Sequence, residues 1–185
     1  MSQVELDIPY TDPRNRLTVA FRLILAIPHM ILAAAWQYAV QITALIQWFI
    51  CVFTGKRNEG LWRFGESYLG YAARVNTYQS ILYDEYPKFG TDSSGSPVRY
   101  SLAYPTEPAN RLTIGLRFLW IIPAVIIAIG VTIAGAVVGI ISWFAILFTG
   151  TMPRGMFDFV LQVQRYGLRL LAYSLLLTDT YPSWS

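Results

Sequence analysis

The chain has 185 residues, of which 55% are hydrophobic and 14% are charged, and 14 Lys and Arg residues against 11 Asp and Glu residues give a formal net charge of +3. An ordinary soluble domain carries about 25% charged residues, so this composition argues against a disordered chain and against a water-soluble enzyme. The positive charges are too few and too scattered for a nucleic-acid surface, so no nucleic-acid partner is expected. One cysteine and one histidine exclude an internal disulfide framework and the His clusters of most metal sites.

Two short arms precede the apolar parts of the chain, from Val4 to Tyr10 and from Val98 to Tyr104. In the second arm apolar and polar residues alternate, which is the period of a half-buried strand. We expect two short strands or extended arms that lie on a membrane surface, with pairing between them as one option.

Two apolar stretches follow these arms, from Leu17 to Phe53 with Arg22 as its one charge, and from Phe118 to Phe148 with none. The second stretch would reach roughly 46 Å as a helix, well past the roughly 30 Å hydrocarbon core of a bilayer. Each stretch is therefore long enough to cross a membrane and must bend, tilt or double back.

A proline near the start of each stretch, Pro28 or Pro123, removes one backbone hydrogen bond and kinks a helix. We interpret each stretch as a short interfacial lead-in, a proline kink and one transmembrane span, from Met30 to Phe53 and from Ala124 to Phe148. A pair of half-length helices is the less favoured alternative, because reversal at membrane depth leaves backbone groups without partners.

Gly55 and Gly150 close the apolar stretches at the position where a helix commonly ends on a left-handed residue. A second helix should follow each glycine, from about Glu59 to Tyr83 and from about Arg154 to Thr178. Apolar residues recur there at spacings of three and four, which predicts amphipathic helices that are aromatic on one face.

Two placements compete for these second helices. An arginine at bilayer mid-depth costs roughly 2.5 to 3.5 kcal/mol, and Arg165 with Arg169 would double that cost. A position at the interface avoids the cost and puts the aromatic rings at the headgroup level, so it is favoured. In the alternative, each helix folds back antiparallel to its span and turns its polar side towards the other unit.

An internal repeat organises the chain: residues 15–87 align with residues 110–182 at a constant offset of 95, and 25 of the 73 positions are identical. A removable targeting segment would not be duplicated in this way. We therefore predict a first unit with its arm over residues 1–87, a polar linker over residues 88–97, and a second unit with its arm over residues 98–185.

Charged residues that recur in both units are candidates for structural or interface contacts. We expect Asp84 to pair with Arg16 or Arg22, and Asp179 with Arg111 or Arg117, because charges near low-dielectric surroundings persist when paired. Separate contacts with headgroups are the alternative. Arg74 and Arg169, which also match at the offset of 95, belong to the same set.

Small and amide side chains inside the apolar stretches point to helix contacts. Gly135 and Gly139 form a small-residue stripe that lets another helix approach closely, either from the other unit or from another subunit. Gln37 and Gln41 share one face of the first stretch, which predicts that this face turns inward towards a polar partner.

The sequence contains no recognisable catalytic or cofactor-binding motif. There is no phosphate-binding glycine loop, no zinc spacing and no dinucleotide fingerprint. His29 and Cys51 have no counterparts in the second unit and are interpreted as packed side chains. We expect no catalysis, no cofactor and no metal.

The shared residues resemble an uncharacterised membrane family, domain of unknown function 4389. The first unit fits its pattern with Ile27 and Pro28, with Trp48 and Phe49, with residues 53–55, with Gly60 and Leu61, with Arg74, Tyr78 and Asp84, and with Tyr86 and Pro87. It departs where Asn58 and Glu59 stand in place of the Pro153 and Arg154 of the second unit. The resemblance implies membrane residence and a two-copy layout, but no activity.

These inferences predict an all-α integral protein of the cell membrane, in which each of two tandem units has a kinked transmembrane helix and an amphipathic helix. We expect a non-enzymatic scaffold or accessory subunit that contacts membrane lipids and a membrane-protein partner or a second copy. The alternative is a carrier or channel for a small solute or lipid, with a path at the repeat interface. That path would be lined by Gln37, Gln41, Arg74 and Arg169.

Overall fold

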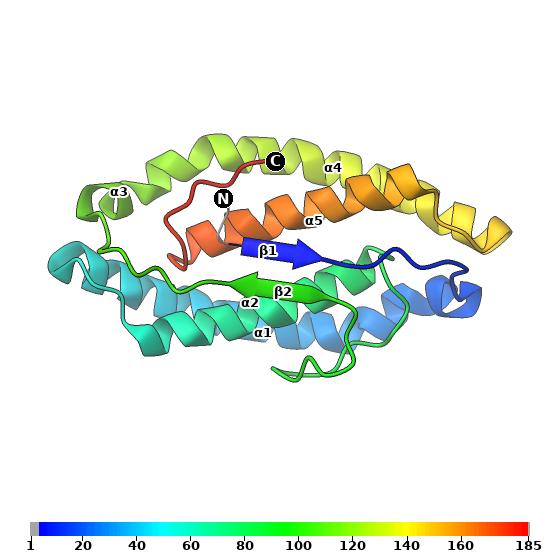
Figure 1. Ribbon diagram of the computed structural model, residues 1–185, viewed down its shortest axis with the longest axis horizontal. Helices are drawn as coiled ribbons and strands as arrows, with labels where there is room; N and C mark the ends of the chain where they lie inside the picture. The colour runs from blue at the N-terminus through cyan, green and yellow to red at the C-terminus, as the bar shows by residue number, and fades with distance from the viewer. Residues whose placement is uncertain (1–3, 185) are drawn as a thin grey trace.

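The computed structural model describes residues 4–184 and is mostly helical (Figure 1). Its elements in chain order are β1 (Val4–Asp7), α1 (Arg16–Thr54), α2 (Glu59–Gln79), β2 (Arg99–Leu102), α3 (Arg111–Gly115), α4 (Arg117–Thr149) and α5 (Arg154–Ser174). The predicted helical class is therefore confirmed, with the addition of one small sheet.

Helix α1 begins at a side-chain cap, where the Asn15 side chain accepts from the backbone N–H of Thr18, and it ends at Gly55 with a φ of +71°. Pro28 lies inside it without ending it. In the first unit the expected lead-in segment and span are therefore one continuous helix of 39 residues. The second unit is interrupted at Leu116, between α3 and α4, and α4 continues through Pro123.

The second helices begin where the sequence predicts, at Glu59 and Arg154, but end four residues early. The reason is a left-handed residue with a φ of 62° after each helix, Ile81 in the first unit and Leu176 in the second. The N–H group of the residue that follows each of them bonds back into the last helical turn, which closes the helix there.

Each second helix folds back along the long helix of its own unit, α2 on α1 and α5 on α4, and the two second helices also contact each other (Figure 1). The antiparallel hairpin, which the sequence left as the alternative, is therefore the arrangement within each unit. The expected position of these helices at a membrane interface stays a prediction. Arg165 and Arg169, whose cost inside a membrane argued against the hairpin, have protein partners in it: Arg165 donates to the Leu6 carbonyl, and Arg169 donates to the Ser183 carbonyl.

The two arms pair with each other, as one of the sequence options allowed. Strands β1 and β2 are antiparallel, with a register from Val4 opposite Leu102 to Asp7 opposite Arg99. Strand β1 contacts α5 and β2 contacts α2, so each arm lies on the other unit. In Figure 1 the strands lie side by side between α2 and α5, and the long helices of the two units run antiparallel.

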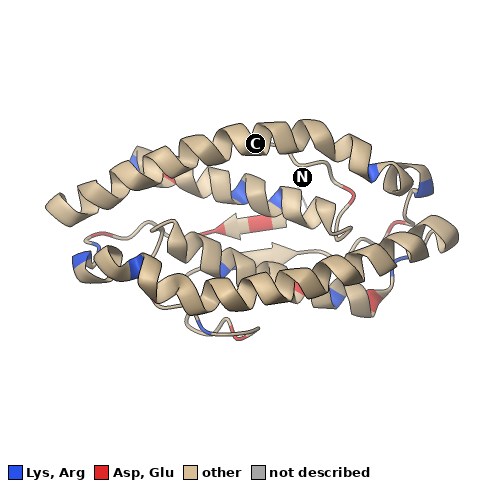
Figure 2. Ribbon diagram, turned by 180° about the vertical axis from the view of Figure 1, so that it is seen from behind, with Lys and Arg blue, Asp and Glu red and all other residues tan. Residues whose placement is uncertain are grey.

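The long helices are both long and apolar enough to cross a membrane. In the most apolar window of each helix, 22% of the α1 residues and 6% of the α4 residues are buried inside the protein. The core helix of a soluble protein would be mostly buried. Figure 2 shows the molecule from behind the view of Figure 1. Helices α1 and α4 carry arginine only near their N-terminal ends.

Candidate functional site

Arg22 closes the C-terminal end of α2. Its Nη1 donates to the carbonyl oxygens of Tyr78 and Tyr83 at 3.0 and 2.7 Å, and its Nη2 donates to Asp84 Oδ1 at 2.7 Å. The arginine is 1% exposed and lies over the Tyr78 ring. A planar guanidinium suits this site because it satisfies several orphan carbonyl groups at a helix end at once.

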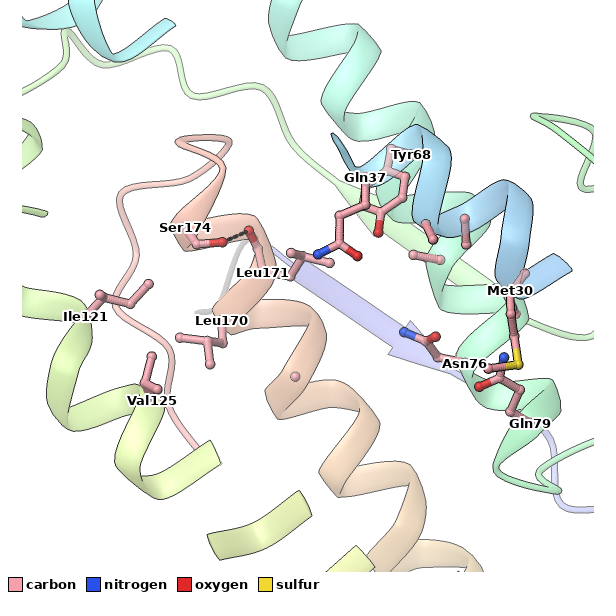
Figure 3. A pocket seen from close by; sticks show the side chains of 15 residues that line it. Met30, Gln37, Tyr68, Asn76, Gln79, Ile121, Val125, Leu170, Leu171 and Ser174 are labelled. Carbon is pink, nitrogen blue, oxygen red and sulfur yellow. Dashed lines mark hydrogen bonds between the residues drawn. The ribbon is translucent and has the colours of Figure 1, made fainter. Parts of the chain in front are cut away.

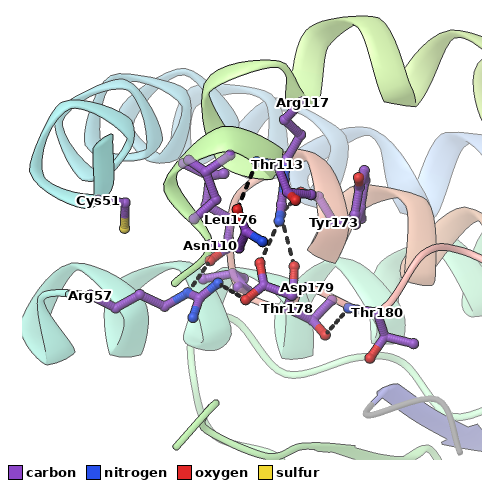
Figure 4. Close-up of polar contacts among 12 residues, drawn as sticks. Cys51, Arg57, Asn110, Thr113, Arg117, Tyr173, Leu176, Thr178, Asp179 and Thr180 are labelled. Atoms are coloured by element: carbon purple, nitrogen blue, oxygen red, sulfur yellow. Dashed lines mark hydrogen bonds and ion pairs between the residues drawn. The ribbon is translucent and has the colours of Figure 1, made fainter. Parts of the chain in front are cut away.

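The second unit repeats this arrangement with Arg117 at the end of α5 (Figure 4). Arg117 Nη1 donates to the carbonyl oxygens of Tyr173 and Thr178, and Nη2 donates to Asp179 Oδ1 at 2.5 Å. Arg57 adds a second cation, because its Nη2 lies 2.5 Å from Asp179 Oδ2. Of the partners expected for the two aspartates, the structure therefore forms the pairs with Arg22 and Arg117.

Arg16 and Arg111, the alternative partners of those aspartates, lie against the glycine turns of the opposite units. A Cβ atom on Gly150 would sit 3.1 Å from Arg16 Nε, and one on Gly55 would sit 3.1 Å from Arg111 Nε. Backbone bonds tie the same places together, from Arg14 to the Gly150 carbonyl and from Ala109 to the Gly55 carbonyl. Both arginines therefore contribute to contacts between the units.

Arg74 and Arg169 hold the chain that follows each second helix. Arg74 Nη2 donates to the Gly90 carbonyl at 2.5 Å, and Arg169 Nη1 donates to the Ser183 carbonyl at 2.9 Å. Burial lowers the pKa of the Arg74 guanidinium, which lies near the Tyr71 ring. Neither arginine lines a cavity beside Gln37 or Gln41, so they do not extend the predicted path.

A groove runs between α1 and α4, and we call it the central groove. Gln37 and Met30 of α1 line one side of its middle part, Ile121 of α4 lines the other, and Asn76 and Gln79 of α2 with Ser174 of α5 also line it (Figure 3). This middle part has a volume of about 540 Å³ and is lined by no charged residue. It lies at the interface of the two repeats, where Gln37 was predicted to face inward.

The central groove continues symmetrically towards both ends of the molecule. Gln41 and Trp48 line one end, of about 690 Å³, and Gly139 and Trp143 line the other, of about 500 Å³. The Trp48 indole donates to the Ile114 carbonyl and the Trp143 indole donates to the Val19 carbonyl, each at 3.0 Å. These bonds join the two units at the ends of the groove.

The predicted glycine stripe divides between two environments. A Cβ atom on Gly135 would meet Val163 Cγ1 at 3.1 Å, so Gly135 permits close packing of α4 on the α5 helix of its own unit. That contact joins neither the two units nor two subunits. A Cβ atom on Gly139 would meet nothing within 4 Å, and Gly139 lines the central groove.

The described residues hold no group of three or more His, Cys, Asp or Glu side chains that could bind a metal ion. His29 accepts or donates one hydrogen bond, to the Tyr71 hydroxyl at 2.7 Å, and stacks on Phe89. Cys51 is buried. What the arrangement offers chemically is an apolar groove with uncharged hydrogen-bonding groups.

Sequence reasoning found Gln37 and Gln41 but missed Asn76, Gln79 and Gln164, which also line the groove. Gln37, Asn76 and Gln79 make no side-chain hydrogen bond among the described residues, whereas Gln164 donates to the Ser80 hydroxyl. Asn76 and Gln79 lie three apart on one face of α2, so the sequence shows that they share a face. It does not show that this face points to the groove.

A family model described as a domain of unknown function, DUF4389, matches residues 16–91 and again residues 111–185. The two matches correspond to the two units and together cover most of the chain. No curated protein and no solved structure matches the chain.

Proposed function

This chain belongs to the DUF4389 family, and from that premise we propose that it is a non-enzymatic protein of the cell membrane that binds a lipid in the central groove. The role is that of a carrier or binding protein for a membrane amphiphile, with its site at the interface of the two repeats. Binding sites between structural repeats are common in membrane carriers.

The observation that carries this proposal is the continuity of the groove with the apolar surface of the long helices. Met30 and Val125, which line its middle part, are also exposed on α1 and α4. An acyl chain that leaves the surrounding lipid would therefore enter the groove without crossing a polar barrier. The volume of its middle part, about 540 Å³, also lies within the range of about 300 to 1,000 Å³ that is typical of small-molecule sites.

The polar groups of the groove favour an uncharged part of the ligand. Gln37, Asn76 and Gln79 offer amide donors and acceptors that are not used within the described part of the chain. Arg22 and Arg117, which line the two ends, already hold carbonyl and carboxylate oxygens. Hydroxyl, ester or amide groups near the lipid glycerol fit this chemistry, because each can pair with a carboxamide.

Lipid analysis of the purified protein tests the proposal. Gly139→Leu and Gly167→Leu place a side chain where the groove is open, and both should lower the amount of co-purified lipid several-fold. Gly130→Leu is the matched control, because Gly130 also has open space but lines none of the described groove parts. Leucine favours a helix over glycine, so all three variants should fold. Equal lipid content in the four proteins would refute lipid binding in the groove.

The same preparation separates this function from the scaffold or accessory subunit that the sequence favoured. A scaffold needs a stable partner, and its ordered lipid would lie on the outer surface, where filling the groove has no effect. Native mass spectrometry of membranes solubilised without harsh detergent should detect the protein with bound lipid. A stoichiometric partner protein together with an unchanged lipid content in Gly139→Leu would favour the scaffold.

A further inference from the structure

We propose that this protein lies flat in one leaflet of the membrane, with α1 and α4 parallel to the membrane plane, and that neither long helix crosses the bilayer. In this orientation the outer surface of α1 and α4 is immersed in the hydrocarbon of that leaflet. The strands β1 and β2 lie on the opposite side and face water. The inference is independent of whether the central groove holds a ligand.

Helix length is the first observation. The 39 residues of α1 and the 33 residues of α4 correspond to roughly 58 and 50 Å of helix. To keep α4 within a hydrocarbon core of roughly 30 Å, the helix would have to tilt by about 50°. Transmembrane helices tilt by about 20° on average and rarely beyond about 40°. A helix that lies in the plane has no such limit.

The strands supply the second observation. They lie midway along the long helices, on top of α2 and α5 (Figure 1). If the helices stood upright, this two-stranded sheet with its unpaired outer edges would sit near the middle of the bilayer. Open sheet edges do not occur in contact with lipid hydrocarbon, because their backbone groups have no partners there. In the flat orientation the same edges are hydrated.

The charges on the sheet lead to the same orientation. Glu5, Asp7 and Arg99 are exposed on the strands, and the ion pair between Arg165 and Asp7 is also partly exposed. An upright molecule would hold these groups at mid-depth, where each charged side chain costs roughly 2.5 to 3.5 kcal/mol. The flat orientation exposes all of them to water.

The opposite side of the molecule matches the interior of a leaflet. Large apolar side chains are exposed along the whole length of both long helices, from Leu23 to Phe53 on α1 and from Phe118 to Phe148 on α4. A layer one helix thick measures about 10 Å, which fits inside one leaflet. Exposed basic residues lie at the ends of the helices, where they can reach phosphate groups: Arg16, Lys56, Arg111 and Arg154.

A second copy of the chain is a weaker candidate to cover this surface than a leaflet. The exposed apolar side chains surround most of α4, since Arg117, Ala124, Ser142 and Ile146 are its buried residues. One flat dimer contact would cover a single side of such a helix and leave the rest in water. Lipid chains cover every exposed side at once.

The two helix turns allow a direct test. Lys56 follows α1, and Gly155 lies in the first turn of α5 at the other end of the molecule; both are exposed, and a side chain on Gly155 meets open space. The double variant Lys56→Cys with Gly155→Cys is inserted into sealed lipid vesicles and treated with a polymer-linked maleimide that cannot cross the membrane. Spanning helices place the two thiols on opposite sides of the bilayer, and flat helices place them on the same side.

We expect each molecule to carry either two polymer chains or none, whichever way it was inserted, and all molecules to carry two after detergent is added. A population with one chain per molecule before detergent would overturn the proposal. The single variants give the efficiency of each site, and the wild-type chain, with its buried Cys51, gives the background.

Polarised infrared spectroscopy of the wild-type protein in oriented lipid layers provides a measurement without substitutions. The helical amide I transition should lie mainly parallel to the layers. A transition mainly along the layer normal would contradict the proposal, and so would recovery of the protein as a soluble dimer that leaves the lipid.

Discussion

Arg22 and Arg117 each satisfy two carbonyl oxygens and a carboxylate at the end of a neighbouring helix, at 1% and 4% exposure. A cation at a helix C-terminus also interacts favourably with the helix dipole. Because both arginines are buried, removal of either side chain leaves several acceptors without donors and a carboxylate without its main partner. Their energetic role is therefore large compared with that of a surface ion pair.

Replacement of Arg22 by Ala should destabilise the protein by about 3–5 kcal/mol, the range for breaking a buried ion pair by removing one partner. For a chain of this size the melting temperature should fall by roughly 10 °C or more. Thermal unfolding in detergent micelles measures the change. Arg117→Ala should destabilise the protein less, because Asp179 keeps its ion pair with Arg57.

Arg63→Ala is the matched control for this prediction. Arg63 pairs with Glu59 at 2.6 Å on the outside of α2, where both side chains are mostly exposed. Exposed pairs of this spacing contribute about 0.3–0.5 kcal/mol, so the melting temperature should hardly move. Similar losses for Arg22→Ala and Arg63→Ala would show that the buried contacts are not important for stability.

Glu66 predicts a dependence of stability on pH. Burial raises the pKa of this carboxyl in the folded protein, so the folded state favours the protonated form. The stability that this preference gives is present below the ordinary glutamate pKa and is lost as the pH rises through the folded pKa. Glu66→Gln should therefore raise the melting temperature at pH 7 and have little effect near pH 4.

The same residue differs between the units, because the position that matches Glu66 is Leu161, which is buried. Glu66→Leu should accordingly also stabilise the protein at pH 7. Melting curves of the three proteins across the acidic range decide the point. A stabilisation by Glu66→Gln that is equally large at pH 4 would exclude ionisation as its cause.

At the scale of the elements, helix starts and glycine turns could be predicted from local residues. Each of these helix ends depends on residues close by in the sequence. Asn15 caps the start of α1, and Gly55 and Gly150 end α1 and α4 in a left-handed conformation. The ends of α2 and α5 could not be predicted, because Ile81 and Leu176 adopt a left-handed conformation that their side chains disfavour. Just beyond these residues, the carbonyl groups of Tyr83 and Thr178 accept from Arg22 and Arg117, each 61 residues away in the chain, so the local sequence does not contain these contacts.

The placement of the second helices depended in the same way on distant partners. Arg165 looked costly inside a membrane, but its partners are the Leu6 carbonyl and Asp7 on a strand of the other unit. Periodicity predicted that α5 is amphipathic and left open which elements cover its polar side. The structure answers this, because the arm of each unit packs on the second helix of the other unit, β1 on α5 and β2 on α2.

Alanine substitutions at two neighbouring glycines should affect stability differently. Gly150→Ala should destabilise the protein by about 1–2 kcal/mol, because the residue has a φ of +79° and alanine disfavours that region. Gly155→Ala, in the first turn of α5 with open space at its Cβ position, should be neutral or slightly stabilising. Melting temperatures in one detergent compare the two. Equal effects would mean that backbone conformation at Gly150 carries no cost.

The whole molecule consists of two units that share one hydrophobic core. The constant offset of 95 predicted the repeat. Gln37 and Gln41 were expected to face inward towards a polar partner; both line the groove, but Gln37 is half-buried without a side-chain hydrogen bond among the described residues, and Gln41 is exposed. The antiparallel arrangement of the units was not predictable, since the linker allows many relative orientations. The central groove arises from that arrangement, so its residues on α2 were visible only in the structure.

Exchange of the arms predicts that the units depend on each other. Chains cut within the linker, residues 1–92 and 93–185, should aggregate when produced separately, because Val4, Leu6 and Ile8 lose their contacts with the other unit. Co-expression of the two halves should restore a stable complex that purifies through a tag on one half. Monodisperse behaviour of each half alone would contradict a shared core.

In the proposed orientation, α1 and α4 form a layer immersed in lipid. Extraction of membranes with alkaline carbonate, followed by centrifugation, tests it most directly on the full chain. We expect the protein to stay in the membrane pellet and to be released only by detergent. Release into the supernatant as a monodisperse protein without amphiphile would contradict it.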